Sequence, residues 1–231
     1  MHEFIEYSDP AQQAAELASV VAKQLSDTLA HQEKATLAVP GGTTPARFLA
    51  ELSNAALEWN RVSVLLSDER FVPETEPRSN TRLLREQFVR NAAAEATIVP
   101  LYAAGATPES VLEQLSAGVR KVSLIDVCVL GMGADMHVAS LFPGGDNLAK
   151  ALDVAGPDVL IPMRASGAEE PRVSLTASAL TGATHLHLLI KGPEKLAALR
   201  HAESEGSAMQ APVRIVLGRR NLTVHYTNGG E

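Results

Sequence analysis

His137 closes a glycine-rich segment, GMGADMH (131–137), and is the residue of this sequence best suited to acid–base chemistry. An imidazole titrates near neutral pH and can therefore take a proton from a water molecule. Gly131 and Gly133 let the backbone approach a ligand closely, and Asp135 could orient the imidazole ring or hold a substrate. A purely structural histidine is the commoner situation for a histidine considered alone, and a place beside glycines at the end of an apolar run makes a general base about equally favoured.

A charged triplet, DER (68–70), follows a second apolar run, RVSVLLS (61–67). Arg70 could clamp a carboxylate or stabilise an oxyanion, and the carboxylates of Asp68 and Glu69 could position hydroxyl groups. A cluster of surface ion pairs is the alternative, and it is the commoner situation for a charged triplet considered alone.

A third polar segment, GGTTP (41–45), follows the short apolar run ATLAVP (35–40). Gly41 and Gly42 permit a tight turn, and Thr44 before a proline predicts a helix capped at that threonine. The start of a helix offers N–H groups that favour an anion such as phosphate. The segment has neither the Gly-Lys-Ser/Thr of a Walker loop nor a GxGxxG fingerprint. A capped helix without any ligand is the alternative.

Other reactive residue types give weaker signals. Cys128 lies inside an apolar run with no obvious base beside it, so we expect a small buried hydrophobe and no nucleophile. His185 and His187 share one face of a predicted strand and could ligate a metal, but no third ligand stands at a plausible spacing. We therefore expect no metal site. The other histidines, which give no site signal, are His2, His31, His201 and His225.

The elements that must position these residues alternate along the chain between short apolar runs and stretches with helical spacing. Strands are predicted at 35–40, 61–67, 97–101, 124–131, 159–163, 172–176, 185–192 and 222–226, and helices at 8–31, from 44 onward, and at 79–90, 107–122, 193–204 and 211–218. This alternation predicts an α/β fold, a doubly wound, mostly parallel sheet with helices on both faces. Ligands bind beyond the carboxyl ends of such strands, so the three polar segments should converge on one cleft.

Length and composition narrow the class of protein. The 231 residues contain no repeat and no long linker, so we expect a single domain over 1–231. The net charge of −7 disfavours a nucleic-acid partner, although a few local cations can still bind a small anion. The single cysteine fits a reducing compartment. The start of the chain is unlike a signal peptide, and no run approaches the roughly 18 apolar residues of a membrane span, so a cytoplasmic location away from membranes is expected.

Taken together, the motifs resemble the 6-phosphogluconolactonases. The matching segments are VPGGTTP, LLSDERFVP with SN at 79–80, LGMGADMHVASLFPG, RVSLTASAL, KGPEK and APVRIVL, in the family's order from about residue 36 to 218. This family shares a Rossmann-like α/β fold with glucosamine-6-phosphate deaminases. The resemblance implies hydrolysis of 6-phospho-D-glucono-1,5-lactone to 6-phosphogluconate, the second step of the oxidative pentose phosphate pathway. It further implies no metal or organic cofactor, a small sugar-phosphate lactone as the partner, and a monomer or small homo-oligomer.

The resemblance also assigns roles to individual residues. They are the catalytic histidine His137 with its acid Asp135, the substrate arginine Arg70, the sugar-phosphate loop Gly41, Gly42, Thr43 and Thr44, the phosphate-binding cations Arg172 and Lys195, and the weaker candidate Arg214. Asp68 remains a candidate for binding hydroxyl groups.

Two positions depart from the family's usual G-P-D-G-H-T. Met136 replaces a glycine and Val138 replaces a threonine, so the geometry of the loop and the rate are open to change. Two other functions remain as alternatives: an isomerase-deaminase acting on glucosamine 6-phosphate, and a sugar-phosphate sensor without catalysis. The stretch SLFPGG (140–145) resembles the lactonases and not the deaminases.

Overall fold

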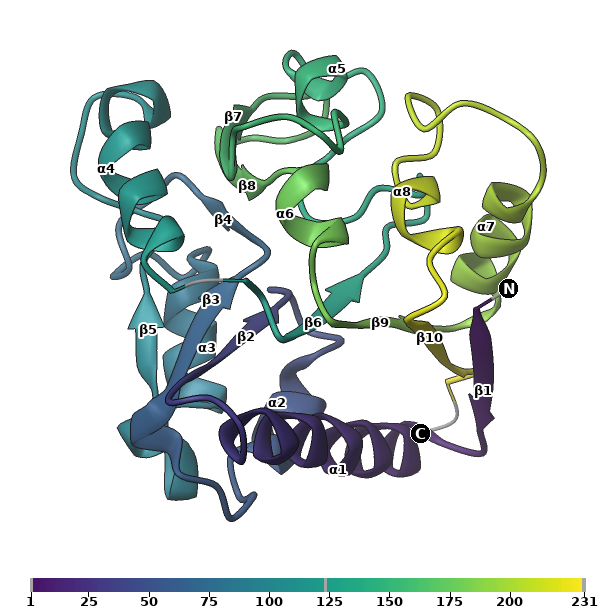
Figure 1. Ribbon diagram of the computed structural model, residues 1–231. Helices are drawn as coiled ribbons and strands as arrows, with labels where there is room; N and C mark the ends of the chain where they lie inside the picture. The colour runs from purple at the N-terminus through teal and green to yellow at the C-terminus, as the bar shows by residue number, and fades with distance from the viewer. Residues whose placement is uncertain (1, 123, 230–231) are drawn as a thin grey trace.

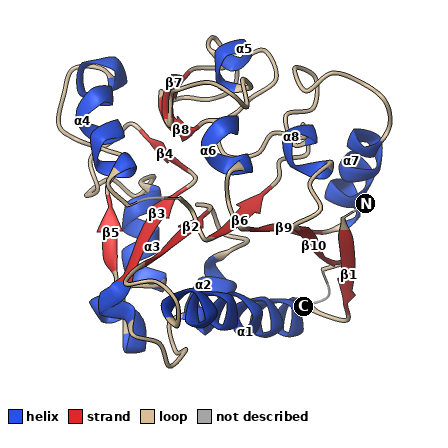
Figure 2. Ribbon diagram, viewed as in Figure 1, coloured by secondary structure: helices blue, strands red, loops and turns tan. Residues whose placement is uncertain are grey.

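The structure, a computed structural model, describes residues 2–122 and 124–229, so positions 1, 123, 230 and 231 of the expected domain lie outside it. Its main sheet consists of parallel strands in the order β1-β10-β9-β6-β2-β3-β5 (Figures 1 and 2). These strands are β1 (Glu3–Tyr7), β2 (Ala35–Val39), β3 (Val62–Leu66), β5 (Thr97–Val99), β6 (Val127–Gly131), β9 (His185–Lys191) and β10 (Leu222–Thr227). The α/β fold with a mostly parallel sheet is thereby confirmed.

Helices cover both faces of this sheet. On one face lie α1 (Pro10–Leu29) and α2 (Ala46–Leu52), and on the other lie α6 (Ala177–Thr181), α7 (Pro193–Glu203) and α8 (Arg214–Leu217), as Figure 1 shows. The remaining helices are α3 (Asn80–Gln87), α4 (Pro108–Arg120) and α5 (Leu148–Ala151), with short 3-10 turns at Trp59–Arg61 and Asn91–Glu95. None of the helices in the described part of the chain has the length and apolar character needed to cross a membrane.

The central strands are apolar on both sides because helices cover them from both faces. All five residues of β2 are buried, and Leu37 pairs with Val64 of β3 and with Val127 of β6. The helix α1 supplies one covering layer: its buried residues recur at helical spacing, and its first turn is capped by the carboxylate of Asp9. The polar segments that follow these strands are therefore carried on a rigid, buried frame.

A second, smaller sheet was not anticipated from the sequence. It is antiparallel, in the order β4-β8-β7, and consists of β4 (Asp68–Arg70), β7 (Leu160–Met163) and β8 (Arg172–Leu175). The chain passes from the main sheet to this one at Ser67, whose N–H donates to Val39 and whose carbonyl accepts from Leu175. The charged triplet that we expected beyond a strand end is thus itself a short strand.

Several predicted strands and helices begin or end at other residues in the structure. The strand β6 begins at Val127 and not at 124. Just before it, the carboxylate of Asp126 accepts a hydrogen bond from the backbone N–H of Thr36. The helix α2 begins after Pro45, and no side chain caps it, so the predicted cap at Thr44 is wrong. The predicted helix over 211–218 is reduced to the single turn α8.

Candidate active site

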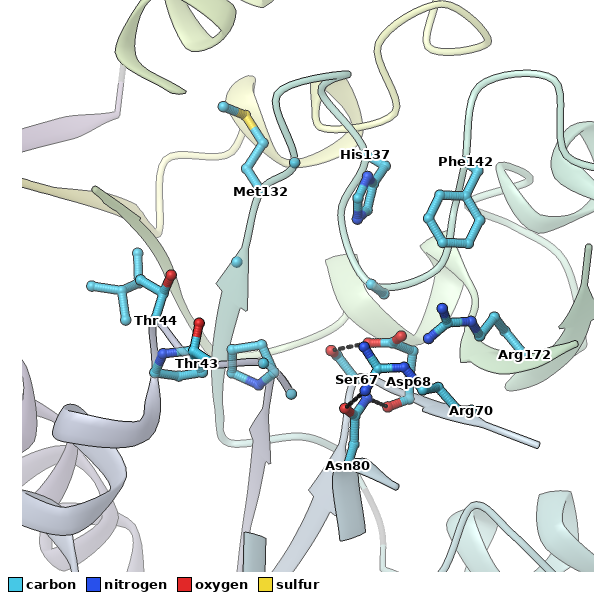
Figure 3. Close-up of a pocket in the computed structure, with 18 of the residues that line it drawn as sticks. Thr43, Thr44, Ser67, Asp68, Arg70, Asn80, Met132, His137, Phe142 and Arg172 are labelled. Carbon is cyan, nitrogen blue, oxygen red and sulfur yellow. Dashed lines mark hydrogen bonds between the residues drawn. The ribbon is translucent and has the colours of Figure 1, made fainter. Parts of the chain in front are cut away.

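A pocket of about 380 Å³ opens at the carboxyl edge of the main sheet, where the loops after β2, β3 and β6 meet (Figure 3). The sequence-predicted residues that line it are Gly41, Gly42, Thr43, Thr44, Asp68, Arg70, His137, Arg172 and Lys195. Residues from all three polar segments are therefore together in space, as the strand-end reasoning predicted. In Figure 3, Thr43 and Thr44 lie across the pocket from His137 and Arg172.

His137 is oriented by Asp135, the acid of the same motif. Its Nδ1 lies 2.5 Å from Oδ1 of Asp135, and this hydrogen bond lowers the pKa of the carboxyl group. A carboxylate only accepts, so Nδ1 carries the proton and the neutral ring keeps Nε2 as an acceptor. The ring also lines the pocket. This is the tautomer that a general base needs.

The loop that carries His137 folds back on itself. Gly133 donates its N–H to the carbonyl of His137 at 3.0 Å, and Met136 donates to the carbonyl of Gly133 at 3.0 Å. A Cβ atom on Gly133 would lie 2.4 Å from both the Asp135 carboxylate and the imidazole ring. The position therefore requires glycine, because any side chain there would displace the histidine and its partner.

Met136, the departure from the family's glycine, does adopt the left-handed backbone conformation, with φ of 65°. This costs a non-glycine residue roughly 1–2 kcal/mol. The N–H of Val213 donates to the carbonyl of Met136 at 3.0 Å and helps to hold the turn. Val138, the second departure, is fully buried and bridges Met132 and Leu141, so its side chain serves the core.

Phe142 forms the wall of the pocket between the histidine and an arginine. Its ring centroid lies 4.7 Å from that of His137, and the Arg172 guanidinium carbon lies 6.0 Å from the same ring. An aromatic face attracts a guanidinium, so Phe142 helps to place Arg172 beside the pocket. Sequence reasoning used this residue only as part of a discriminating stretch and did not predict its place in the site.

Arg70 and Arg172 lie directly opposite each other on β4 and β8. Arg172 is only 9% exposed, and desolvation lowers the pKa of its guanidinium, partly offset by Asp68. The Nε atoms of both arginines are buried and have no hydrogen-bond partner within the described residues. Two adjacent guanidinium groups with N–H groups to spare favour a negatively charged ligand.

Asp68 is held firmly beside these arginines. Its Oδ2 accepts a 2.5 Å hydrogen bond from the hydroxyl of Ser140, and its Oδ1 accepts one of 3.1 Å from Ser67. Glu69 is different: its carboxylate accepts from the backbone N–H groups of Asn80 and Thr81. Glu69 therefore fixes the start of α3, and the expectation that it positions substrate hydroxyls is wrong.

The loop after β2 and the start of α7 bring a further cation to the pocket. Gly42 takes a φ of 92°, a conformation that favours glycine, and Gly41 packs against the side chain of Asn80. Lys195 lies in the first turn of α7, where burial lowers the pKa of its ammonium group. The hydroxyl groups of Thr43 and Thr44 in this loop (residues 41–44, the threonine loop) and the ammonium group of Lys195 can together bind an anion.

The remaining candidates lie elsewhere. Arg214 donates to the carbonyls of Ala202 and Ser207 at 2.9 Å each, so it holds the end of α7 and faces away from this pocket. Cys128 is fully buried, which raises the pKa of its thiol to about 12. Within the ranges 2–122 and 124–229, no three His, Cys, Asp or Glu side chains gather closely enough to hold a metal ion.

Comparison with known proteins identifies what this chain resembles. The family model of glucosamine-6-phosphate isomerases/6-phosphogluconolactonase matches residues 8–225. A 6-phosphogluconolactonase of Rhizobium meliloti is 44% identical over 92% of this chain and 92% of its own length, and one of Pseudomonas aeruginosa is 40% identical over 95% and 92%.

The folded chain gives the same result. The crystal structure of a 6-phosphogluconolactonase from Shewanella baltica superimposes with a TM-score of 0.94 at 30% identity, covering 98% of this chain and 97% of that one. The resemblance found in the sequence motifs is thereby confirmed. The chain belongs to the family of glucosamine-6-phosphate isomerases and 6-phosphogluconolactonases.

Proposed function

We propose that this protein hydrolyses 6-phospho-D-glucono-1,5-lactone to 6-phosphogluconate, with His137 as the general base. The activity is the one for which the relatives at 31–44% identity are named, and their membership of the same family supports a hydrolase. The observation that carries the mechanism is the 2.5 Å contact between Nδ1 of His137 and Asp135, which leaves Nε2 as the acceptor in the pocket.

The reaction needs one proton acceptor and one site for a negatively charged oxygen. Nε2 of His137 takes a proton from water as the water oxygen bonds to C1 of the lactone, and the carbonyl becomes an oxyanion. When this intermediate collapses, the bond from C1 to the ring oxygen breaks and the imidazolium returns its proton to that oxygen. General base catalysis contributes a factor of roughly 10²–10⁴, and Asp135 stabilises the imidazolium.

The cations have separate roles in this proposal. Arg70 meets the developing oxyanion, whereas Lys195 and the threonine loop bind the phosphate. Arg172, opposite Arg70 on β8, adds positive charge on the Arg70 side of the pocket. Charge-assisted hydrogen bonds of this kind contribute about 1.5–3 kcal/mol each. Contacts to the phosphate are far from C1, so they serve binding and orientation more than the chemical step.

Glucosamine-6-phosphate isomerisation with release of ammonia is the second candidate, because the matching family model covers that activity as well. The relatives that cover most of this chain carry the lactonase name, which favours hydrolysis. An ammonia-release assay separates the two, since lactone hydrolysis produces acid and no ammonia.

The direct test compares wild type with His137→Ala on freshly generated lactone, in a coupled or pH-drop assay with spontaneous hydrolysis subtracted. We expect kcat to fall at least ~100-fold with a modest change in KM. His201→Ala, an exposed histidine on α7, is the matched control and should keep its kcat. Near wild-type turnover by His137→Ala would remove this residue as the base.

A further inference from the structure

Asn80 is a pocket residue that none of the expectations above gives a role. It is the first residue of α3, is only 4% exposed, and lines the pocket between the threonine loop and β4 (Figure 3). Its side chain fills the space above Gly41, where a Cβ atom would lie 2.1 Å from the Asn80 Cγ. The residue therefore joins two of the three segments that form the site.

The hydrogen bonds of Asn80 fix its side-chain amide in one orientation. Oδ1 accepts from Nη1 of Arg70 at 2.9 Å, and Nδ2 donates to the backbone carbonyl of Asp68 at 3.0 Å. A guanidinium only donates and a carbonyl only accepts, so the opposite orientation of the amide would lose both bonds. The backbone N–H of Asn80 is held in turn by Glu69 at 2.7 Å.

These contacts determine which nitrogen of the Arg70 guanidinium is available to a ligand. Nη1 is occupied twice, by Oδ1 of Asn80 and by the carbonyl of Arg78 at 2.7 Å. Nε is buried and has no hydrogen-bond partner in the described part of the chain. Because Nε is shielded from solvent, it cannot reach a ligand in the pocket, and Nη2, which makes no hydrogen bond to the described residues, is the nitrogen left to donate to an anionic group.

We propose that Asn80 is a positioning residue for the reaction: it holds Nη1 of Arg70 so that Nη2 meets the oxygen that becomes negative at C1 of the lactone. This inference rests on the proposed function. Asn80 touches no reacting atom itself and acts through the guanidinium. The arrangement is set before substrate arrives, because β4 and the threonine loop both contact the amide.

A double-mutant cycle over Asn80 and Arg70 tests this role. We expect Arg70→Ala to lower kcat about 100-fold or more, as for loss of an oxyanion donor. Asn80→Ala should lower kcat about tenfold, and the double variant should match Arg70→Ala within about twofold, because Asn80 has nothing left to position. If Asn80 contributed to folding alone, its effect would not depend on Arg70, and the fold-losses of the two single variants would multiply in the double variant. That result would overturn the proposal.

Asn80→Ser keeps a short polar side chain at the start of α3 and repeats the cycle if the alanine variant folds poorly. Glu86→Ala, an exposed position on the same helix, is the matched control and should keep kcat within about twofold. A loss confined to KM in the Asn80 variants would overturn the assignment to the oxyanion. If the wild type does not hydrolyse the lactone, the proposed function is wrong. If it does, but the losses of the two single variants multiply in the double variant, only the inference about Asn80 is wrong.

Discussion

Histidines in two regions of this molecule have opposite surroundings. At the carboxyl edge of the sheet, His137 is partly exposed in a pocket and bonded to a carboxylate. In the interior, His187 of β9 and His225 of β10 are 2% and 1% exposed and bonded to each other at 3.0 Å. The glycine-rich motif distinguished His137 in the sequence, whereas the contact between His187 and His225 could not be predicted from it.

The interior histidines belong to a continuous hydrogen-bonded chain. Nδ1 of His225 lies 2.8 Å from the hydroxyl of Tyr7, and Nε2 of His187 lies 2.9 Å from Oε1 of Gln24. Both ends of this chain are neutral groups, and burial lowers the pKa of both histidines well below the usual value. These rings are therefore neutral structural members that join β1, β9, β10 and α1.

The difference between the two groups is the charge of the partner. The His137 ring is hydrogen-bonded to the Asp135 carboxylate, which is the partner that the proposed general base requires. In the interior there is no carboxylate bonded to His187 or His225 among the described residues, so proton uptake there opposes folding. A bonded carboxylate and access to a pocket distinguish the histidine that we propose as the base from the two structural histidines, which lack both.

The largest expected effect is acid destabilisation through the interior pair. The folded-state pKa values of His187 and His225 lie below the unfolded value of about 6.5, so their contribution to stability is complete above that pH and declines as the pH falls below it. Each proton that folding excludes adds about 1.4 kcal/mol per pH unit to the decline.

Urea unfolding at pH 7.5 and pH 5 measures this decline. His187→Asn, which cannot be protonated, should lose less stability than wild type between the two pH values. The same variant should keep its kcat at pH 7.5, because the ring lies outside the pocket. An equal loss in both proteins would show that other groups carry the acid sensitivity.

The second effect concerns the loop that holds His137 and Asp135, the proposed catalytic pair. Gly133→Ala places a Cβ atom 2.4 Å from the imidazole ring of His137 and from the Asp135 carboxylate, so the pair must separate or move. We expect kcat to fall about 100-fold, which corresponds to about 2.7 kcal/mol. Gly118→Ala on α4, where an added Cβ meets nothing within 4 Å, is the control. Unchanged turnover would mean that the observed Asp135 contact is dispensable.

The smallest effect lies at the opposite end of the pocket. Lys195→Ala removes the ammonium group that we propose binds the phosphate, so KM should rise about tenfold while kcat changes little. Steady-state kinetics with the lactone gives both constants. Lys150→Ala, whose exposed ammonium group is paired with Asp158, is the control. A loss confined to kcat would argue against binding of the phosphate by Lys195.

The sequence was informative where chemistry follows a buried strand. Apolar runs predicted the strands, so the three polar segments that follow them were expected at one edge of the sheet. The structure brings residues from all three segments into one pocket. The motif around His137 needed no long-range information, because its partner Asp135 is two residues away.

Contacts between distant segments were not predictable in the same way. The pairing of Arg70 with Arg172 depends on an antiparallel sheet whose strands are far apart in sequence, and three-residue strands such as β4 show no alternation of their own. The contact of Asn80 with Gly41 likewise arises only when α3 packs beside the loop. The edge strand β1 was missed because its exposed and partly buried residues show no clear apolar run.

Restoring the base from solution tests the central claim most directly. In the His137→Ala variant, added imidazole should raise lactone turnover in proportion to its concentration, above the rate of imidazole with lactone alone. The same addition to wild type should change nothing. A His137→Ala variant that folds, binds 6-phosphogluconate and yet turns over lactone at the wild-type rate without imidazole would contradict the account.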